Sequence, residues 1–188
     1  MPFDHFAAIA PLYARATYFN IDVLSEVADL PVNGVLLDVG GGTGRVASAI
    51  RDLINEVFIA DISLGMLKHT SRESFKLVCS CSEAIPFSNE SFDRVLMVDA
   101  LHHVMDQRAT ASELLRVAKQ GGIIVIEEPD IRALGVKLIA AIEKMLFMRS
   151  RFLAPDKIVD LFDGQVKKIK VKDGTAWIVI KKKITQNA

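Results

Sequence analysis

The fold of this chain is decided by the stretch Leu36-Leu37-Asp38-Val39-Gly40-Gly41-Gly42-Thr43-Gly44-Arg45. An apolar run comes first, then four glycines in five positions, and then residues spaced as in a helix. This order predicts a buried strand, a tight turn and a helix N-terminus. Glycines at Gly40, Gly42 and Gly44 let the backbone approach a ligand closely. The unpaired N–H groups of the helix start favour a nucleotide-like or carboxylate-bearing ligand.

Three nucleotide-binding motifs can be compared with this turn. A phosphate-binding P-loop ends in Gly-Lys-Ser/Thr, whereas Gly44 is followed here by Arg45 and Val46. The dinucleotide fingerprint G-x-G-x-x-G needs a glycine where Arg45 stands. The remaining pattern, with Asp38 two residues before Gly40, resembles the first motif of the class I S-adenosylmethionine-dependent methyltransferases. The resemblance implies S-adenosylmethionine as cofactor, and it assigns to cofactor binding Asp38, Gly40, Gly41, Gly42 and Gly44. The alternative is an ordinary glycine turn of an α/β protein that binds no ligand.

Length and composition limit the class of protein. A chain of 188 residues suits one domain with a full core, and 51% hydrophobic with 24% charged residues indicates a globular chain. No apolar run is long enough to span a bilayer, and the N-terminus lacks a basic region and an apolar signal core. We therefore expect a cytoplasmic protein without stable membrane insertion. The formal net charge of zero argues against a surface built mainly for nucleic acid, and the lysines between 167 and 183 alternate with apolar residues as on a solvated sheet edge.

The two cysteines, Cys79 and Cys81, lie two positions apart. On a strand they would point to the same face. Their spacing is not C-x-x-C, and the chain has no second pair for a zinc site. We expect no metal, and we interpret both cysteines as small apolar core residues.

A second apolar run ends at Asp61, which lies 17 residues after Gly44. This is close to the spacing at which a carboxylate binds ribose hydroxyls, and one carboxylate can accept both hydroxyl protons. The alternative role of Asp61 is a helix N-cap, but Ser63 can supply that cap instead. The sequence therefore favours ribose binding by Asp61. In the resembled family the next residues flank the adenine, which implies that Ile62 and Met66 contact the cofactor.

A partial match to the family's second motif follows a third strand, expected at 76–80. In the family this strand ends in Gly-Asp-Ala-Glu-x-Leu-Pro-Phe, and here the chain reads Cys81-Ser82-Glu83-Ala84-Ile85-Pro86-Phe87. Cys81 stands where the family has an aspartate that hydrogen-bonds the adenine amino group, and a thiol is a poor acceptor. The resemblance then implies that adenine recognition depends on backbone groups near Ser82 and Glu83. Val98, at the end of the fourth strand, is assigned to the same cofactor site.

Two adjacent histidines, His102 and His103, come directly after that fourth strand. Strand ends at the switch point of an α/β sheet carry ligands, and histidine can bind an acceptor or remove a proton from it. Both are therefore candidate catalytic residues. His102 is the first candidate, because a Leu-His pair recurs here in similar sequences. The alternative is that one histidine orients a loop while the other is exposed.

The two ends of the chain extend the resemblance. The segment Phe3-Asp4-His5-Phe6-Ala7 with Tyr13 resembles the N-terminal segment of the ubiquinone/menaquinone-biosynthesis type of methyltransferase. This implies that residues 1–30 form a helical cover over cofactor and acceptor, and that the apolar stretch 146–153 lines the acceptor pocket. Near the other end, two strand-like runs joined by Asp173-Gly174 predict a hairpin whose last strand inserts antiparallel into the sheet.

We therefore predict a single-domain α/β protein of 188 residues, with a Rossmann-like core over residues 34–184. The fold is a three-layer sandwich with a seven-stranded, mostly parallel sheet and an antiparallel last strand. The expected function is methyl transfer from S-adenosylmethionine to a small, apolar or aromatic acceptor. One alternative is a non-catalytic S-adenosylmethionine-binding protein that regulates or scaffolds a partner. The other is an NAD-dependent oxidoreductase, against which Arg45 argues.

Overall fold

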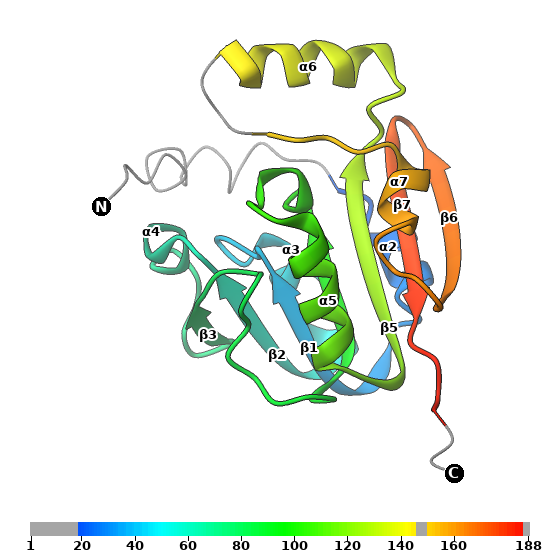
Figure 1. Ribbon diagram of the computed structural model, residues 1–188. Helices are drawn as coiled ribbons and strands as arrows, with labels where there is room; N and C mark the ends of the chain where they lie inside the picture. Colours follow the sequence, from blue (N-terminus) through cyan, green and yellow to red (C-terminus); the bar gives the residue numbers. More distant parts are fainter. Residues whose placement is uncertain (1–18, 146–149, 186–188) are drawn as a thin grey trace.

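The computed structural model describes residues 19–145 and 150–185 (Figure 1). Within these ranges the chain forms a seven-stranded sheet in the order β3-β2-β1-β4-β5-β7-β6. Strands β1 to β5 run parallel, and β7 runs antiparallel between β5 and β6. The strands are β1 (Val32–Val39), β2 (Ile54–Asp61), β3 (Lys76–Cys79), β4 (Phe92–Val98), β5 (Ala118–Pro129), β6 (Val166–Lys172) and β7 (Thr175–Lys181). The predicted fold class and the inserted last strand are confirmed.

Helices cover both faces of this sheet, which gives three layers (Figure 1). Neighbouring residues of β1 show the alternation, because Leu37 packs into the core on the α5 side while Leu36 packs into the core on the α2 side. Leu114 of α5 belongs to the first core, and Leu24 of α2 belongs to the second. The helical elements are α2 (Ile21–Val27), α3 (Arg45–Ala49), η1 (Arg51–Leu53), α4 (Leu64–Leu67), η2 (Leu101–His103), α5 (Gln107–Val117), α6 (Leu134–Met145) and α7 (Pro155–Val159).

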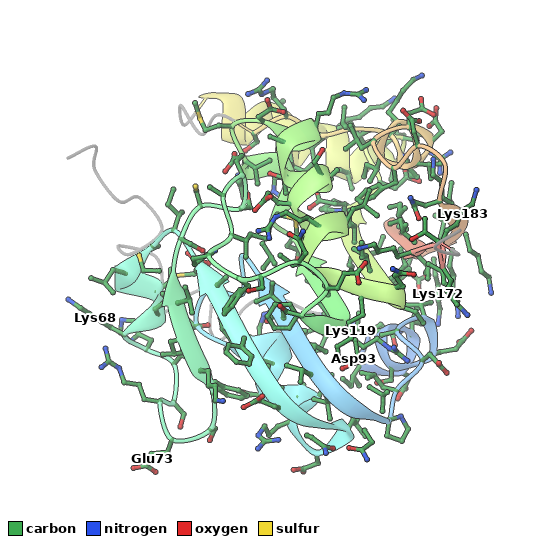
Figure 2. All side chains as sticks on the ribbon, turned by 60° about the horizontal axis from the view of Figure 1, so that its bottom comes forward. Lys68, Glu73, Asp93, Lys119, Lys172 and Lys183 are labelled. Carbon is green, nitrogen blue, oxygen red and sulfur yellow. The ribbon has the colours of Figure 1, made fainter. Side chains whose placement is uncertain are left out.

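The β6–β7 hairpin closes one side of the sheet. Asp173 and Gly174 both have left-handed backbone, with φ of 51° and 78°, as a two-residue type I′ turn requires. Strand β6 is the outermost strand, so its lysines lie on a sheet edge as the sequence predicts. Figure 2 labels Lys172 and Lys183 on this side of the molecule. The last strand ends at Lys181, three residues before position 184, where the sequence places the end of the core.

Gly121 has a different role from the one the sequence suggests. The run Lys119-Gln120-Gly121-Gly122 after the helical pattern of 109–118 predicts a helix that ends with Gly121 in a left-handed conformation, but α5 ends at Val117 and the chain passes directly into β5. Gly121 has φ of +73° inside β5, where the pairing with β4 shifts its register. It therefore lies where the pairing of β5 with β4 is irregular, and glycine adopts this conformation at little cost.

The amino ends of the central strands are joined by one carboxylate. Asp93 Oδ2 accepts hydrogen bonds from the Val35 amide at 2.9 Å and from Lys119 Nζ at 2.8 Å. These contacts connect β4 to β1 and to β5, and Figure 2 shows Asp93 and Lys119 side by side. The opposite, carboxyl ends of the strands are left for the site.

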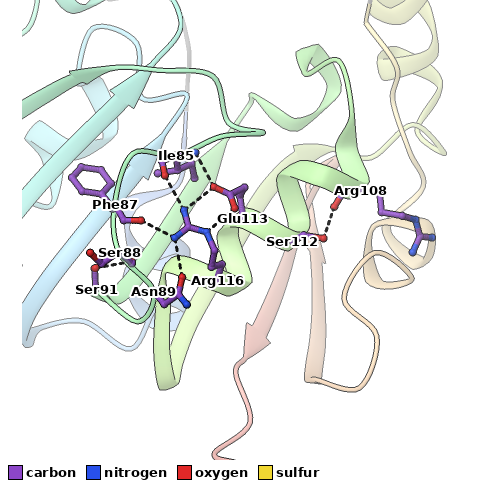
Figure 3. A network of polar contacts seen from close by, with 9 residues as sticks. All are labelled: Ile85, Phe87, Ser88, Asn89, Ser91, Arg108, Ser112, Glu113 and Arg116. Carbon is purple, nitrogen blue, oxygen red and sulfur yellow. Dashed lines mark hydrogen bonds and ion pairs between the residues drawn. The ribbon is translucent and has the colours of Figure 1, made fainter.

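The loop between β3 and β4 is held against α5 by Arg116 (Figure 3). The Arg116 guanidinium donates to the carbonyls of Phe87 at 2.7 Å and Ile85 at 2.8 Å. Glu113, one turn earlier, accepts from the Ile85 amide at 2.8 Å and also pairs with Arg116. This network fixes the loop whose first residues, 81–83, reach the carboxyl edge of the sheet.

Candidate functional site

A cavity opens at the carboxyl ends of β1, β2 and β4. The chain leaves β1 toward β2 and β3, and then crosses back to place β4 on the other side of β1. The cavity therefore lies at the topological switch point, where open α/β sheets bind ligands. Eight residues singled out from the sequence line it: Gly40, Asp61, Ile62, Met66, Cys81, Ser82, Glu83 and His103. The other lining residues are Val39, Ala60, Ser80, Met97, Asp99, Ala100, Val104 and Met105.

The glycine turn forms one wall of this cavity through Gly40. Gly40, Gly42 and Gly44 all have positive φ, of 71°, 54° and 76°, a conformation that glycine adopts at little cost. A Cβ on Gly44 would lie 2.7 Å from the Thr70 side chain, so this glycine also permits close packing. Gly41, Gly42 and Gly44 lie outside the cavity lining and shape the turn behind Gly40.

Asp61 connects the glycine turn to the next helix. Its Oδ2 accepts from the Gly42 amide at 2.8 Å, and its Oδ1 accepts from the Ser63 amide at 2.7 Å. Ser63 Oγ in turn accepts from the Met66 amide at 3.1 Å and caps α4. The prediction that Ser63 can supply the helix cap is therefore confirmed. A carboxylate has about four acceptor positions, so the two backbone bonds of Asp61 are compatible with hydroxyl binding as well.

Asp38 lies beneath the turn and does not line the cavity. Burial, and next the nearby charge of Asp61, raises the pKa of Asp38 to about 7. Its Oδ2 has no hydrogen-bond partner among the described residues. A Cβ on Gly41 would lie 2.6 Å from this oxygen, so the carboxyl group packs directly against the turn backbone. Val98 also lies outside the lining and packs into the core on the α2 side.

The cysteines do not share the core position expected for them. Strand β3 ends at Cys79, which is exposed, and Cys81 lies beyond the strand in the cavity wall. The strand alternation that would place them on one face therefore does not reach Cys81. Close by, Glu83 Oε1 accepts from the amides of Met105 at 2.9 Å and Asp106 at 3.1 Å, which brings the β3–β4 loop against the segment after η2.

The two histidines have different surroundings. His102 is only 4% exposed, and its ring stacks on Phe152 with centroids 4.2 Å apart. His103 lines the cavity, and its Nδ1 lies 3.2 Å from Ser150 Oγ. Burial, and next the charge of His102, lowers the pKa of His103 to about 3. The structure thus places His103 at the cavity as a neutral ring, whereas His102, the first candidate from the sequence, lies behind it.

Two acidic residues of this region were not singled out from the sequence. Asp99 lines the cavity directly after β4, has φ of 51°, and forms a 3.8 Å ion pair with Arg45. Glu128 is 3% exposed in β5 and hydrogen-bonds η2. An acid directly after an apolar strand was the signal that identified Asp61, and the same signal is present at Asp99. The corresponding signal for Glu128 is that two glutamates, Glu127 and Glu128, directly follow the apolar run of β5.

Only part of the expected cover is described. Residues 1–18 and 146–149 lie outside the described ranges. Of the second cover stretch, Phe152 contacts the His102 ring, and the Arg151 amide donates to the His102 carbonyl at 2.7 Å. In the described part of the chain, no group of three or more His, Cys, Asp or Glu side chains is arranged to hold a metal ion. No described helix is long and apolar enough to cross a membrane.

The sheet order and the glycine turn at its switch point define the Rossmann-like fold of the class I S-adenosylmethionine-dependent methyltransferases. Residues 37–126 match the family described as methyltransferase domain. The family and the fold imply S-adenosylmethionine as the cofactor.

Two curated relatives come from quinone biosynthesis. Demethylmenaquinone methyltransferase of Paenarthrobacter aurescens is 32% identical over 108 residues, which is 56% of this chain and 43% of the relative. The ubiquinone/menaquinone biosynthesis C-methyltransferase UbiE of Coxiella burnetii is 36% identical over 104 residues, which is 50% of this chain and 42% of the relative. The chain thus spans less than half the length of these curated relatives in the matched region.

Solved structures show the same fold at lower identity. A putative methyltransferase from Bacillus halodurans has a TM-score of 0.76 at 18% identity, covering 88% of this chain and 99% of that one. A Thermotoga maritima S-adenosylmethionine-dependent methyltransferase, described as a possible histamine N-methyltransferase, has a TM-score of 0.76 at 22% identity, covering 95% of this chain and 98% of that one.

Proposed function

We propose that this protein transfers a methyl group from S-adenosylmethionine to a small, apolar or aromatic acceptor, and that the acceptor is a quinone-type ring in its reduced, hydroxyl-bearing form. The observation that carries the proposal is a single cavity that joins the glycine turn and Asp61 to His103. The proposed cofactor position has the amino-acid end at Gly40, the ribose at Asp61 and the adenine beside Met66 and Cys81. The remaining wall then faces the transferred methyl group.

The charges of the lining support this cofactor over a dinucleotide. Asp61, Glu83 and Asp99 are the acidic side chains among the lining residues, and Arg45 lies against Asp99 from outside the lining. S-adenosylmethionine carries a positive sulfonium and a positive amino group, which such a wall attracts. The two phosphates of NAD would instead meet carboxylates, and like charges at short range are unfavourable.

The acceptor side of the cavity carries apolar side chains beside His103. Met97, Val104 and Met105 lie on this side, and apolar walls with few polar groups are typical of sites for flat, greasy ligands. The cofactor supplies an already activated methyl group, so the protein has to align the acceptor in line with it and exclude water. A neutral His103 can accept a hydrogen bond from a ring hydroxyl of the acceptor. The names of the two quinone-biosynthesis relatives favour a ring of that kind.

Binding and turnover test the two parts of this proposal. In calorimetry, S-adenosylmethionine and S-adenosylhomocysteine are expected to bind, and NAD is expected not to displace them. With a short-chain reduced demethylmenaquinone analogue, mass spectrometry is expected to show the addition of one methyl group. Displacement of S-adenosylhomocysteine by NAD would contradict the cofactor. Tight binding of S-adenosylmethionine without transfer to any ring acceptor would instead support the non-catalytic, regulatory or scaffolding function.

A further inference from the structure

Glu128 makes an unusual set of contacts for a buried carboxylate. It is 3% exposed near the end of β5, yet its partners lie on η2, after the neighbouring strand β4. Oε1 accepts from the amides of Ala100 at 3.0 Å and Leu101 at 2.8 Å. Oε2 lies 2.6 Å from His102 Nδ1. One carboxylate therefore serves both the N-terminus and a side chain of this short turn.

A buried carboxylate is costly unless hydrogen bonds compensate for the water it has lost. All of the hydrogen bonds of Glu128 described above go to η2, and none of them joins two strands of the sheet. The preceding residue is a useful contrast. Glu127 is equally buried on the other face of β5, where its Oε2 accepts from Trp177 Nε1 at 2.7 Å. The Glu127 contact joins β5 to β7 and leaves η2 untouched.

The short turn η2, which Glu128 holds, carries the part of the cavity wall that we assign to the acceptor. Ala100, His103 and Val104 all line the cavity, and all three lie in or next to η2. An ionised carboxylate only accepts, so His102 donates through Nδ1, which fixes the tautomer and the orientation of its ring. That ring contacts both the Phe152 ring and the His103 ring, whose centroid is 3.9 Å away. His103 is thus supported from behind by a ring that Glu128 orients.

We propose that Glu128 is a positioning residue for the acceptor: through the η2 amides and the His102 ring it sets the His103 ring toward the cavity, where His103 accepts a hydrogen bond from a hydroxyl of the acceptor. The identity of the acceptor rests on the function proposed above, whereas the positioning of His103 does not. The low pKa of His103 agrees with this role, because a ring that stays neutral at neutral pH can still accept a hydrogen bond.

Glu128→Gln tests this inference, with Glu127→Gln as the matched control for loss of a buried carboxylate. In Glu128→Gln the amide oxygen can still accept from Ala100 and Leu101, but the amide nitrogen cannot accept from His102 Nδ1. Glu128→Asp keeps the charge and withdraws it by one methylene, so it provides a second variant should the glutamine variant fail to fold. All measurements use the full chain.

The first readout needs no acceptor. Ring nitrogens of His102 and His103 are followed by ¹⁵N NMR against pH, assigned with His102→Gln and His103→Gln, together with amide exchange at Ala100 and Leu101. In the wild type, His103 is expected to stay neutral from pH 5 to 8. In Glu128→Gln it is expected to titrate within that range. The two amides are expected to exchange about tenfold faster, because a neutral amide oxygen accepts less strongly than a carboxylate oxygen, with Glu127→Gln like the wild type. Unchanged rings and amides in both Glu128 variants, or equal changes in Glu127→Gln, would overturn the inference.

The second readout separates the acceptor from the cofactor. Glu128→Gln is expected to lower kcat/KM for the acceptor by about 100-fold, since a misplacement of about 1 Å has effects of that size. Its affinity for S-adenosylhomocysteine is expected to stay within about twofold of the wild type. An equal loss of cofactor affinity would point to general damage and overturn the inference. A wild-type chain without methyl transfer would refute the proposed function, and the NMR result would still decide the role of Glu128.

Discussion

The Asp61 carboxylate accepts a hydrogen bond from the Gly42 amide, with 2.8 Å between Oδ2 and N, so the end of β2 holds the glycine turn that follows β1. Its second oxygen accepts from the Ser63 amide at the start of α4. The residue that we assign to the ribose therefore also fixes the shape of the turn. Its removal is expected to affect both cofactor binding and stability.

Asp61→Ala is expected to weaken binding of S-adenosylhomocysteine by about 2–4 kcal/mol, because two charge-assisted hydrogen bonds to the ribose are lost. It is also expected to lower the free energy of unfolding by about 1–3 kcal/mol, because the amides of Gly42 and Ser63 lose their acceptor. Calorimetry and urea unfolding measure the two effects. Asp52→Ala, an exposed carboxylate in η1, is the control. Wild-type affinity in Asp61→Ala would show that Asp61 serves the turn alone.

Cys81→Asp is expected to tighten cofactor binding by on the order of 1 kcal/mol, because a carboxylate accepts from the adenine amino group better than a thiol does. The gain stays modest because a partly buried carboxylate loses hydration. The control is Cys79→Asp, since Cys79 is exposed and lies outside the cavity lining. A large loss of affinity in a folded Cys81→Asp protein would mean that the adenine does not lie beside Cys81.

Gly41→Ala is expected to destabilise the fold by about 1–3 kcal/mol, as overpacked sites do. Its Cβ would lie 2.6 Å from Asp38 Oδ2 and 2.8 Å from Ile59 Cγ2, both inside the protein. The control is Gly135→Ala in α6, whose Cβ would meet nothing within 4 Å. Urea unfolding of both variants checks this, and equal stability of the two would show that the turn relaxes to admit a methyl group.

Much of this arrangement could be predicted from the sequence, because it depends on local patterns. The spacing of apolar residues and glycines predicts β1 and its turn, and Asp173-Gly174 predicts the closing hairpin. An acid directly after an apolar strand identifies Asp61. Each of these signals spans a few neighbouring residues, and the strand order then follows from the connections that parallel sheets favour.

The contacts between distant residues could not be predicted in this way. Glu128 lies 26 positions from His102, and nothing near either residue indicates that their side chains meet. The sequence ranks His102 above His103 on the recurrence of a Leu-His pair, although of the two only His103 is in the cavity lining. Gly121 was assigned to a helix end because the irregularity in which it lies depends on the pairing of β5 with β4.

The pH dependence of stability is expected to carry a contribution from Asp38. Its pKa is about 7 in the fold and 3.8 as an ordinary carboxyl, so the folded state binds more protons between these values. Asp38 therefore contributes at most about 4 kcal/mol to the free energy of unfolding. This contribution is fully present below pH 4 and is lost as the pH rises to 7. His103 opposes it, since its lowered pKa removes stability as the pH falls from 6.5 toward 3. The difference between Asp38→Asn and the wild type isolates the Asp38 contribution.

The stability of Asp38→Asn relative to the wild type is expected to increase as the pH rises from 4 to 7. Glu127→Gln should give a slope of the same sign, because burial also raises the pKa of Glu127 to about 7. Urea unfolding at several pH values measures both. A difference that is flat across this range would show that Asp38 is ionised in the fold throughout.

The last prediction concerns the cover of the acceptor cavity. Phe152 stacks on the His102 ring and Ser150 hydrogen-bonds His103, so the described end of the second cover stretch rests directly on η2. Cofactor and acceptor bound in the cavity would order η2, and segments over a ligand site generally belong to the least stable parts of a fold. S-adenosylhomocysteine is therefore expected to slow amide exchange in residues 101–104 and 150–153.

The Asp173-Gly174 turn, outside the cavity lining, should exchange at an unchanged rate. From the sequence resemblance we expect the same protection in residues 3–18, which lie outside the described ranges. Protection confined to the glycine turn would place the acceptor somewhere other than the wall that His103 forms.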